Sequence, residues 1–119
     1  MSSRFAELCV DSRDPVRLAR FWCEVLGFEI TEEDEGVVYI EGSEDPFPGI
    51  TFAKVDDPKK GKNRLHMDLT PSDSDQEDEI RRLLELGARR VDIGQGDVSW
   101  VVMADPEGNE FCVLATDRP

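Results

Sequence analysis

The stretch Asp14-Pro-Val-Arg-Leu-Ala-Arg-Phe-Trp-Cys-Glu-Val-Leu-Gly-Phe28 decides the fold, because it is a helix signal with both ends marked. Asp14 suits an N-cap, Pro15 suits the first helical position, and Gly27 suits the residue after the last turn. Between these ends runs an apolar stripe at helical spacing, formed by Leu18, Phe21, Trp22, Val25 and Leu26. We therefore expect an amphipathic helix.

The same plan returns about sixty residues later, although few side chains are identical. The landmark pairs that lie 59 or 60 residues apart are Asp14 and Asp73, Gly27 and Gly87, Gly36 and Gly96, Asp45-Pro46 and Asp105-Pro106, and Gly49-x-x-Phe52 and Gly108-x-x-Phe111. A unit of this size is too small to bury a good core alone. The two copies are therefore expected to pack on each other, with a cleft between them.

Each copy reads as β-α-β-β-β, with short alternating or apolar runs around the helix. In the first module we expect strands near 5–10, 28–31, 37–41 and 50–55, and a polar linker at 56–63. In the second we expect strands near 64–70, 89–92, 98–104 and 110–115. The second helix should start near Asp73 or Asp75, bury Ile80, Leu83 and Leu84, and end at Gly87. The fold class is α+β, with tandem βαβββ modules at 4–55 and 64–116 of a single domain, 1–119.

Composition restricts the possible partners. With 39% hydrophobic residues, 34% charged residues and no apolar run of membrane-spanning length, the sequence predicts a soluble protein without a membrane partner. A strand pattern begins almost at the N-terminus, which leaves no room for a signal peptide and favours the cytoplasm. Three cysteines without paired spacing fit a reducing compartment.

The net charge of −13, from 27 acidic and 14 basic residues, argues against nucleic acid as a partner. A cationic or neutral small molecule is the easier ligand. Alternatively, the charge serves solubility, because much of the excess lies in solvated stretches at 32–35 and 73–79. The three lysines of the linker are expected to be solvated as well.

His66 is the only histidine, and it alternates with apolar residues in Leu65-His-Met-Asp-Leu69. If Leu65, Met67 and Leu69 pack under the helix, then His66 and Asp68 face the concave side of the sheet. The repeat places Glu7 at the position equivalent to His66, and Glu110 of the last strand is equivalent to Thr51. Glu7, His66 and Glu110 are therefore predicted to converge.

One imidazole and two carboxylates suit a divalent ion such as Mn²⁺, Fe²⁺, Ni²⁺, Co²⁺ or Zn²⁺, with positions left open for substrate. The alternative is that His66 is an isolated polar residue of a pocket and that both glutamates face water. Cys9 and Cys112 are predicted on the same concave face, where a thiolate would ligate a soft metal, although buried thiols are commoner.

The chain resembles the vicinal oxygen chelate superfamily, which includes glyoxalase I, extradiol dioxygenases, fosfomycin-resistance transferases and bleomycin-binding proteins. Nearly the whole chain carries the resemblance, and it looks closest to small glyoxalase-like proteins with Phe-Trp in the first helix. The segments that carry it are 14–28, Leu65-His-Met-Asp-Leu69, Glu85-Leu-Gly-Ala88 and Asp105-Pro-Glu-Gly-Asn-Glu-Phe-Cys-Val-Leu114.

The resemblance implies that the two modules form a half-open mixed β-barrel around a metal, with the helices on the outside. It puts His66 and Glu110 at family metal positions, and Glu7 where glyoxalase I and the fosfomycin enzymes usually carry His or Gln. Thr51 stands where glyoxalase I has its fourth ligand. The chain thus departs from glyoxalase I, and its single histidine departs from the two-His-one-carboxylate set of the dioxygenases.

Two alternative functions are therefore expected. The first is a metal-dependent lyase, isomerase or related enzyme, in which the ion chelates adjacent oxygens of a small substrate and Glu7 or Glu110 acts as general base. The second is a metal-free protein of the bleomycin-binding kind, whose acidic, aromatic cleft sequesters a cationic antibiotic or metabolite.

For either function, the substrate or ligand pocket is expected to be lined by four residues from both modules, namely Tyr39, Thr51, Asp68 and Trp100. Phe5 and Phe47 are further candidates for an aromatic wall, although aromatic residues at such positions are more often core. Relatives in the superfamily often dimerise, and a homodimer is expected.

Overall fold

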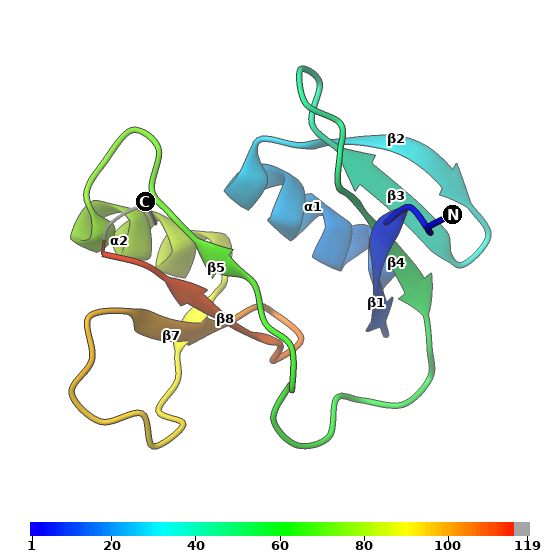
Figure 1. Cartoon of the computed structure of the whole chain (residues 1–119). Coiled ribbons are helices and arrows are strands. Elements are labelled where there is room, and N and C mark those ends of the chain that lie inside the picture. The colour runs from blue at the N-terminus through cyan, green and yellow to red at the C-terminus, as the bar shows by residue number, and fades with distance from the viewer. Residues whose placement is uncertain (116–119) are drawn as a thin grey trace. The chain divides into compact units, whose positions relative to one another are not determined.

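The computed structural model describes residues 1–115 and shows two compact units, Met1–Pro58 and Lys59–Pro119, the latter including residues outside the described range. Both units have the predicted βαβββ order, and both sheets have the same strand order, β1-β4-β3-β2 and β5-β8-β7-β6 (Figure 1). The predicted α+β class with two modules is confirmed. The unit boundary falls inside the predicted linker.

The first unit contains β1 (Glu7–Ser12), α1 (Pro15–Leu26), β2 (Glu29–Asp34), β3 (Val37–Glu41) and β4 (Gly49–Lys54). β1 and β4 pair in parallel and the other pairs are antiparallel, so the sheet is mixed. α1 covers one face of this sheet (Figure 1). Its core includes Leu18, Trp22, Ile40 and Phe52, none more than 2% exposed.

The ends of α1 match the sequence prediction. The backbone N–H of Arg17 donates to Asp14 Oδ1 at 3.3 Å, and Pro15 occupies the first turn. Gly27 ends the helix with a φ of 70°, a left-handed conformation that favours glycine. The predicted stripe is buried except for Leu26, which is half-buried.

The second unit contains β5 (Asp68–Leu69), α2 (Gln76–Leu86), β6 (Arg89–Arg90), β7 (Val101–Ala104) and β8 (Glu110–Val113). β5 pairs with β8 in parallel, with Asp68 opposite Cys112. Asp75 caps α2 by accepting from the backbone N–H of Asp78 at 2.9 Å, and Gly87 ends the helix. Gln76 Nε2 donates to the Val113 carbonyl at 3.0 Å and ties α2 to β8.

Two packing predictions in this unit are wrong. Leu84 is 41% exposed, because the buried stripe of α2 consists of Ile80 and Leu83. Leu65 is 83% exposed, because the paired part of β5 begins only at Asp68 and the predicted strand at 64–70 is far shorter. The strand expected at 98–104 likewise begins at Val101.

The described part of the chain contains no helix that is both long and apolar enough to cross a membrane. The predicted half-open barrel depends on how the two units pair, and it stays a prediction. The prediction that residues 1–119 form a single domain also stays a prediction. Residue 116, the predicted end of the second module, lies outside the described residues.

Candidate functional site

The face of the first sheet that is turned away from α1 carries polar side chains. In β3 and β4, Val38, Ile40, Ile50 and Phe52 are buried toward the helix, so the alternate residues point the other way. Tyr39 pairs with Thr51, and β1 aligns Glu7 with Gly49. The predicted residues Glu7, Tyr39 and Thr51 thus share one face.

A cavity of about 600 Å³ lies on this face. The Thr51 hydroxyl donates to Glu7 Oε2, which joins two of the lining strands. Three of the lining residues are carboxylates and none is basic, which is the charge that favours a cation. The lining consists of Ala6, Glu7, Glu32, Asp34, Val37, Tyr39 and Thr51.

Glu32 and Asp34 reach the cavity because of a β-bulge. β2 and β3 change register between Ile30 and Glu32, so Ile30 pairs with Ile40 whereas Glu32 pairs with Tyr39. In a regular strand, Glu32 would share the face of Ile30 and point toward the helix. Sequence reasoning read these acidic residues as a solvated turn and missed their place in the cavity.

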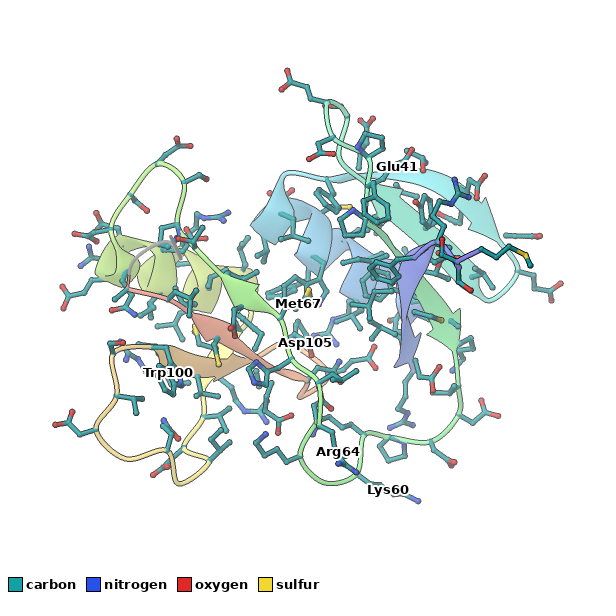
Figure 2. The ribbon with its side chains drawn as sticks, in the orientation of Figure 1. Glu41, Lys60, Arg64, Met67, Trp100 and Asp105 are labelled. Atoms are coloured by element: carbon teal, nitrogen blue, oxygen red, sulfur yellow. The ribbon has the colours of Figure 1, made fainter. Side chains whose placement is uncertain are left out.

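Tyr39 lies over Gly49, and a methyl group added to Gly49 would overlap the phenol. Partial burial raises the pKa of Tyr39, and a hydrogen bond to Glu41 raises it further. The nearby charges of Glu41, Glu7 and Glu32 act in the same direction. Glu41 lies at the end of β3 (Figure 2). The raised pKa of Tyr39 thus reflects first its partial burial and then the negative charge on this face of the sheet.

In the second unit, three side chains with different ligand atoms meet on β5, β8 and the segment before β5. His66 Nδ1 lies 3.2 Å from Asp68 Oδ1 and 3.8 Å from Cys112 Sγ. One ligand atom from each residue can be chosen so that all three lie within 4.8 Å of one another. A nitrogen, a carboxylate oxygen and a sulfur at this spacing fit a divalent ion chemically.

The cluster opens to solvent on one side. The side chains of His66 and Asp68 are 38% and 34% exposed, whereas Cys112 is buried. Burial raises the pKa of the Cys112 thiol, and so do the charge of Asp68 and a hydrogen bond to it. Cys9 on the first sheet is exposed as a residue. The limited desolvation of its thiol raises the pKa of Cys9, and the negative charges of Asp11 and Glu7 raise it further.

Glu110 makes a separate set of contacts. Its Oε1 accepts from the backbone N–H of Asn63 at 2.9 Å, and Lys59 Nζ lies 3.2 Å from both carboxylate oxygens. Burial alone would raise the pKa of Glu110, but these backbone hydrogen bonds and the Lys59 ammonium outweigh it and hold the pKa below its ordinary value. The prediction that the linker lysines are solvated is wrong for Lys59, because its side chain is only 18% exposed.

A family model described as a glyoxalase-like domain matches residues 7–114. The chain belongs to this family. It is thereby a member of the vicinal oxygen chelate superfamily, as the resemblance implied. No curated protein matches this glyoxalase-like chain in a sequence comparison.

Solved structures share the fold at low identity. The fosfomycin resistance protein FosX from Mesorhizobium loti has a TM-score of 0.72 and 12% identity, and the match covers 98% of this chain and 94% of that one. A FosX mutant from Listeria monocytogenes, complexed with Mn(II) and 1S,2S-dihydroxypropylphosphonic acid, has a TM-score of 0.72 and 13% identity over 98% and 93%. A glyoxalase/bleomycin resistance protein/dioxygenase family enzyme from Burkholderia phytofirmans has a TM-score of 0.65 and 16% identity over 91% and 94%.

Within this glyoxalase-like chain, the predicted site residues fall into two groups. Glu7, Tyr39 and Thr51 meet in the first unit, and His66 and Asp68 meet in the second. Trp100 lies just before β7 (Figure 2). It is 41% exposed. Phe5 and Phe47 contact each other edge to face at 5.7 Å and are not part of the cavity lining.

The predicted ligand set of Glu7, His66 and Glu110 stays a prediction. The sequence analysis put His66, Asp68 and Cys112 on one concave face, but it did not predict that their ligand atoms would meet. The pairing of Cys112 with Asp68 depends on the register between β5 and β8, which the sequence pattern does not state.

Proposed function

We propose that this glyoxalase-like protein is a divalent-metal-dependent lyase, isomerase or related enzyme acting on a small molecule with adjacent oxygens. The observation that carries the proposal is the cluster of His66, Asp68 and Cys112, whose ligand atoms approach within 4.8 Å. The presence of Mn(II) in the FosX structure from Listeria monocytogenes supports metal dependence at the level of fold. A bound divalent ion would act as a Lewis acid and stabilise developing negative charge on the substrate.

The two predicted general bases differ in their suitability. Glu110 holds its charge tightly, because Asn63 and Lys59 both stabilise its ionised form, which makes it a weak proton acceptor. Glu7 is exposed and makes a hydrogen bond to the Thr51 hydroxyl. Glu7 is therefore the better candidate for taking a proton from a substrate.

Metal analysis of tag-free protein, purified without chelator, tests this function. We expect about one ion per chain and a melting temperature that rises when divalent ions are added. His66→Ala should lose both effects, whereas Glu33→Gln, at an exposed carboxylate of β2, should keep them. A wild-type protein with no stoichiometric ion and no thermal response would refute metal dependence.

A test of turnover follows from the same preparation. Metal-loaded wild type, screened for glyoxalase, dioxygenase and epoxide-opening reactions, should turn over a substrate that Glu7→Gln converts at least about 100-fold more slowly. Glu7→Gln should retain the metal. Equal rates for the two proteins would exclude Glu7 as the base.

A second function is favoured by the acidic cavity of the first unit. In this reading the protein binds a cationic antibiotic or metabolite without turnover, with Glu7, Glu32 and Asp34 supplying charge and Tyr39 supplying an aromatic face. The matched pair Glu32→Gln and Glu33→Gln tests it, since neighbouring residues of β2 point to opposite faces.

Calorimetric titration with a cationic glycopeptide such as bleomycin should give saturable binding. Glu32→Gln should weaken this binding about tenfold or less, as expected for one partly solvated charge, and Glu33→Gln should leave it unchanged. An equal loss in both variants would point to nonspecific attraction by the net charge of −13.

A further inference from the structure

Two groups on β8 are alternative metal ligands next to His66: the carboxylate of Glu110 and the thiol of Cys112. Glu110 and Cys112 lie two residues apart on β8, so their side chains project from the same face of the strand. The register places Cys112 opposite Asp68, two residues further along β8 than Glu110. The surroundings of these groups differ, and the difference decides which of them is available.

Glu110 is already engaged on both carboxylate oxygens. The Asn63 backbone N–H and the Lys59 ammonium hold it, and its side chain is only 12% exposed. If Glu110 turned to a metal, the Lys59 ammonium would lose this carboxylate partner while still largely buried and would keep the Gly61 carbonyl, and the Asn63 N–H would lose the Glu110 oxygen that accepts from it. This cost opposes the use of Glu110 as a ligand.

Cys112 and Asp68 are already within ligand distance of His66. Bond lengths to zinc of about 2.0 Å for nitrogen and oxygen and about 2.3 Å for sulfur imply tetrahedral ligand separations of about 3.3 Å and about 3.5 Å. The observed separations are 3.2 Å from His66 Nδ1 to Asp68 Oδ1 and 3.8 Å from Nδ1 to Cys112 Sγ. Both pairs that include His66 are thus close to the spacing that a small ion requires, and the Asp68 and Cys112 ligand atoms lie within 4.8 Å of each other.

We propose that the metal of this protein is held by His66, Asp68 and Cys112, with Cys112 as a thiolate ligand and Glu110 as part of a structural contact with Lys59. The inference rests on the proposed metal dependence and specifies its ligand set. A site with one sulfur, one nitrogen and one oxygen prefers Zn²⁺ or Co²⁺ over the harder Mn²⁺ and Mg²⁺. The exposed side of His66 and Asp68 leaves room for a fourth ligand.

Cobalt provides a direct spectroscopic test, because a thiolate bound to Co²⁺ gives an intense charge-transfer absorption in the near ultraviolet that nitrogen and oxygen ligands do not give. Tag-free, full-length apoprotein is titrated with Co²⁺, and the complex is then titrated with Zn²⁺ and, separately, with Mn²⁺. We expect the charge-transfer band in the wild type, its loss on adding one equivalent of Zn²⁺, and its persistence in excess Mn²⁺.

The variants assign the ligands. Cys112→Ser and Cys112→Ala should abolish the band and weaken zinc binding at least about tenfold, and Asp68→Asn should weaken it by a similar factor. Cys9→Ser is the matched thiol control, because Cys9 is an exposed cysteine of the first unit, and it should behave as wild type. Glu110→Gln should keep the band. Circular dichroism and melting temperature confirm that each variant is folded.

The possible results separate this inference from the proposed function. If wild type binds one ion without a charge-transfer band, and Glu110→Gln loses that ion while remaining folded, the ligand set is wrong and metal dependence stands. If Cys9→Ser rather than Cys112→Ser loses the band, the thiolate has been misassigned. If the wild type binds neither Co²⁺ nor Zn²⁺, both proposals fail.

Discussion

Glu110 illustrates how the contacts of one residue set its chemistry. Its position on β8 matches a metal position of the superfamily by resemblance, yet its carboxylate is held by Lys59 and Asn63. Those contacts favour the charged form and lower the pKa of Glu110. A carboxylate stabilised in this way contributes to folding stability and is less suited to proton transfer.

Replacing Glu110 by Gln should lower the free energy of unfolding by about 1–3 kcal/mol at pH 7, because a charged hydrogen-bonding partner is lost. Since the folded-state pKa is depressed, this stabilisation is complete above the unfolded-state pKa of about 4.3 and is lost as the pH falls through the folded-state pKa. Urea denaturation of wild type and Glu110→Gln from pH 7 to pH 3 should show the gap closing at the acidic end. Glu33→Gln serves as the exposed-glutamate control, and a gap that does not vary with pH would contradict the assignment.

Tyr39 reports on the acidic face of the first unit, and it is the only tyrosine of the chain. Its ionisation, followed by ultraviolet absorbance, should have a midpoint above the ordinary value of about 10, because partial burial and the carboxylate of Glu41 disfavour the phenolate. Glu41→Gln should lower the midpoint, and so should Gly49→Ala, whose new methyl group displaces the phenol. A titration midpoint that is the same in wild type and Glu41→Gln would show that Tyr39 does not contact this carboxylate. Circular dichroism checks that each variant stays folded.

At the scale of elements, the turn between β7 and β8 shows why the segment Asp105-Pro-Glu-Gly-Asn109 is a usable fold signal. Asp105, labelled in Figure 2, begins this turn. It is 1% exposed, and its Oδ1 accepts from the backbone N–H groups of Glu107 and Asn109, each at 2.9 Å. Gly108 has a φ of 88°, which favours glycine at that position. The side chain of Asp105 thus supplies the hydrogen bonds that close the turn.

Asp105→Ala should therefore destabilise the protein by about 1–3 kcal/mol, because two partly buried backbone N–H groups lose their acceptor. Asp45→Ala is a matched control from the corresponding segment of the first unit, where the aspartate is exposed, and it should cost less than about 0.5 kcal/mol. Thermal and urea denaturation measure both. Equal effects of the two substitutions would contradict the role given to the turn.

Comparing equivalent glycines of the two units shows how far the internal repeat extends. Gly27 and Gly87 both end helices in the left-handed conformation, so this landmark has one cause in both units. Gly49 and Gly108 match in the sequence but not in their role, since Gly49 lies under Tyr39 and Gly108 forms a turn. The repeat predicted the order of elements correctly, and it did not predict the local reason for every landmark.

At the scale of the whole molecule, the homodimer expected from the resemblance is the prediction to measure. Sedimentation equilibrium of the 13.4 kDa chain should give twice that mass, and the mass should stay constant over a tenfold dilution for a tight dimer. Buffers of about 0.15 M salt are needed, because the net charge of −13 produces repulsion between chains at lower ionic strength. A monomer mass at all concentrations would contradict the expectation.

The sequence by itself determined the elements of this protein and their order. Caps such as Asp14 and Asp75, glycines with positive φ and apolar stripes act within a few residues of one another, so they can be read along the chain. Strand ends were predicted less well, because a strand extends only as far as its partner does. β5 accordingly begins at Asp68 rather than at Arg64.

Only the tertiary structure decided which side chains meet. The bulge in β2 turns Glu32 to the face of Tyr39, the register of β5 and β8 brings Cys112 to His66, and Lys59 binds Glu110 across 51 residues of sequence. Each of these contacts depends on strand register or on the path of a linker, and a slip of one residue would reverse the faces. Local sequence patterns specify neither, which is why the candidate ligands could be named from the sequence while their partners could not.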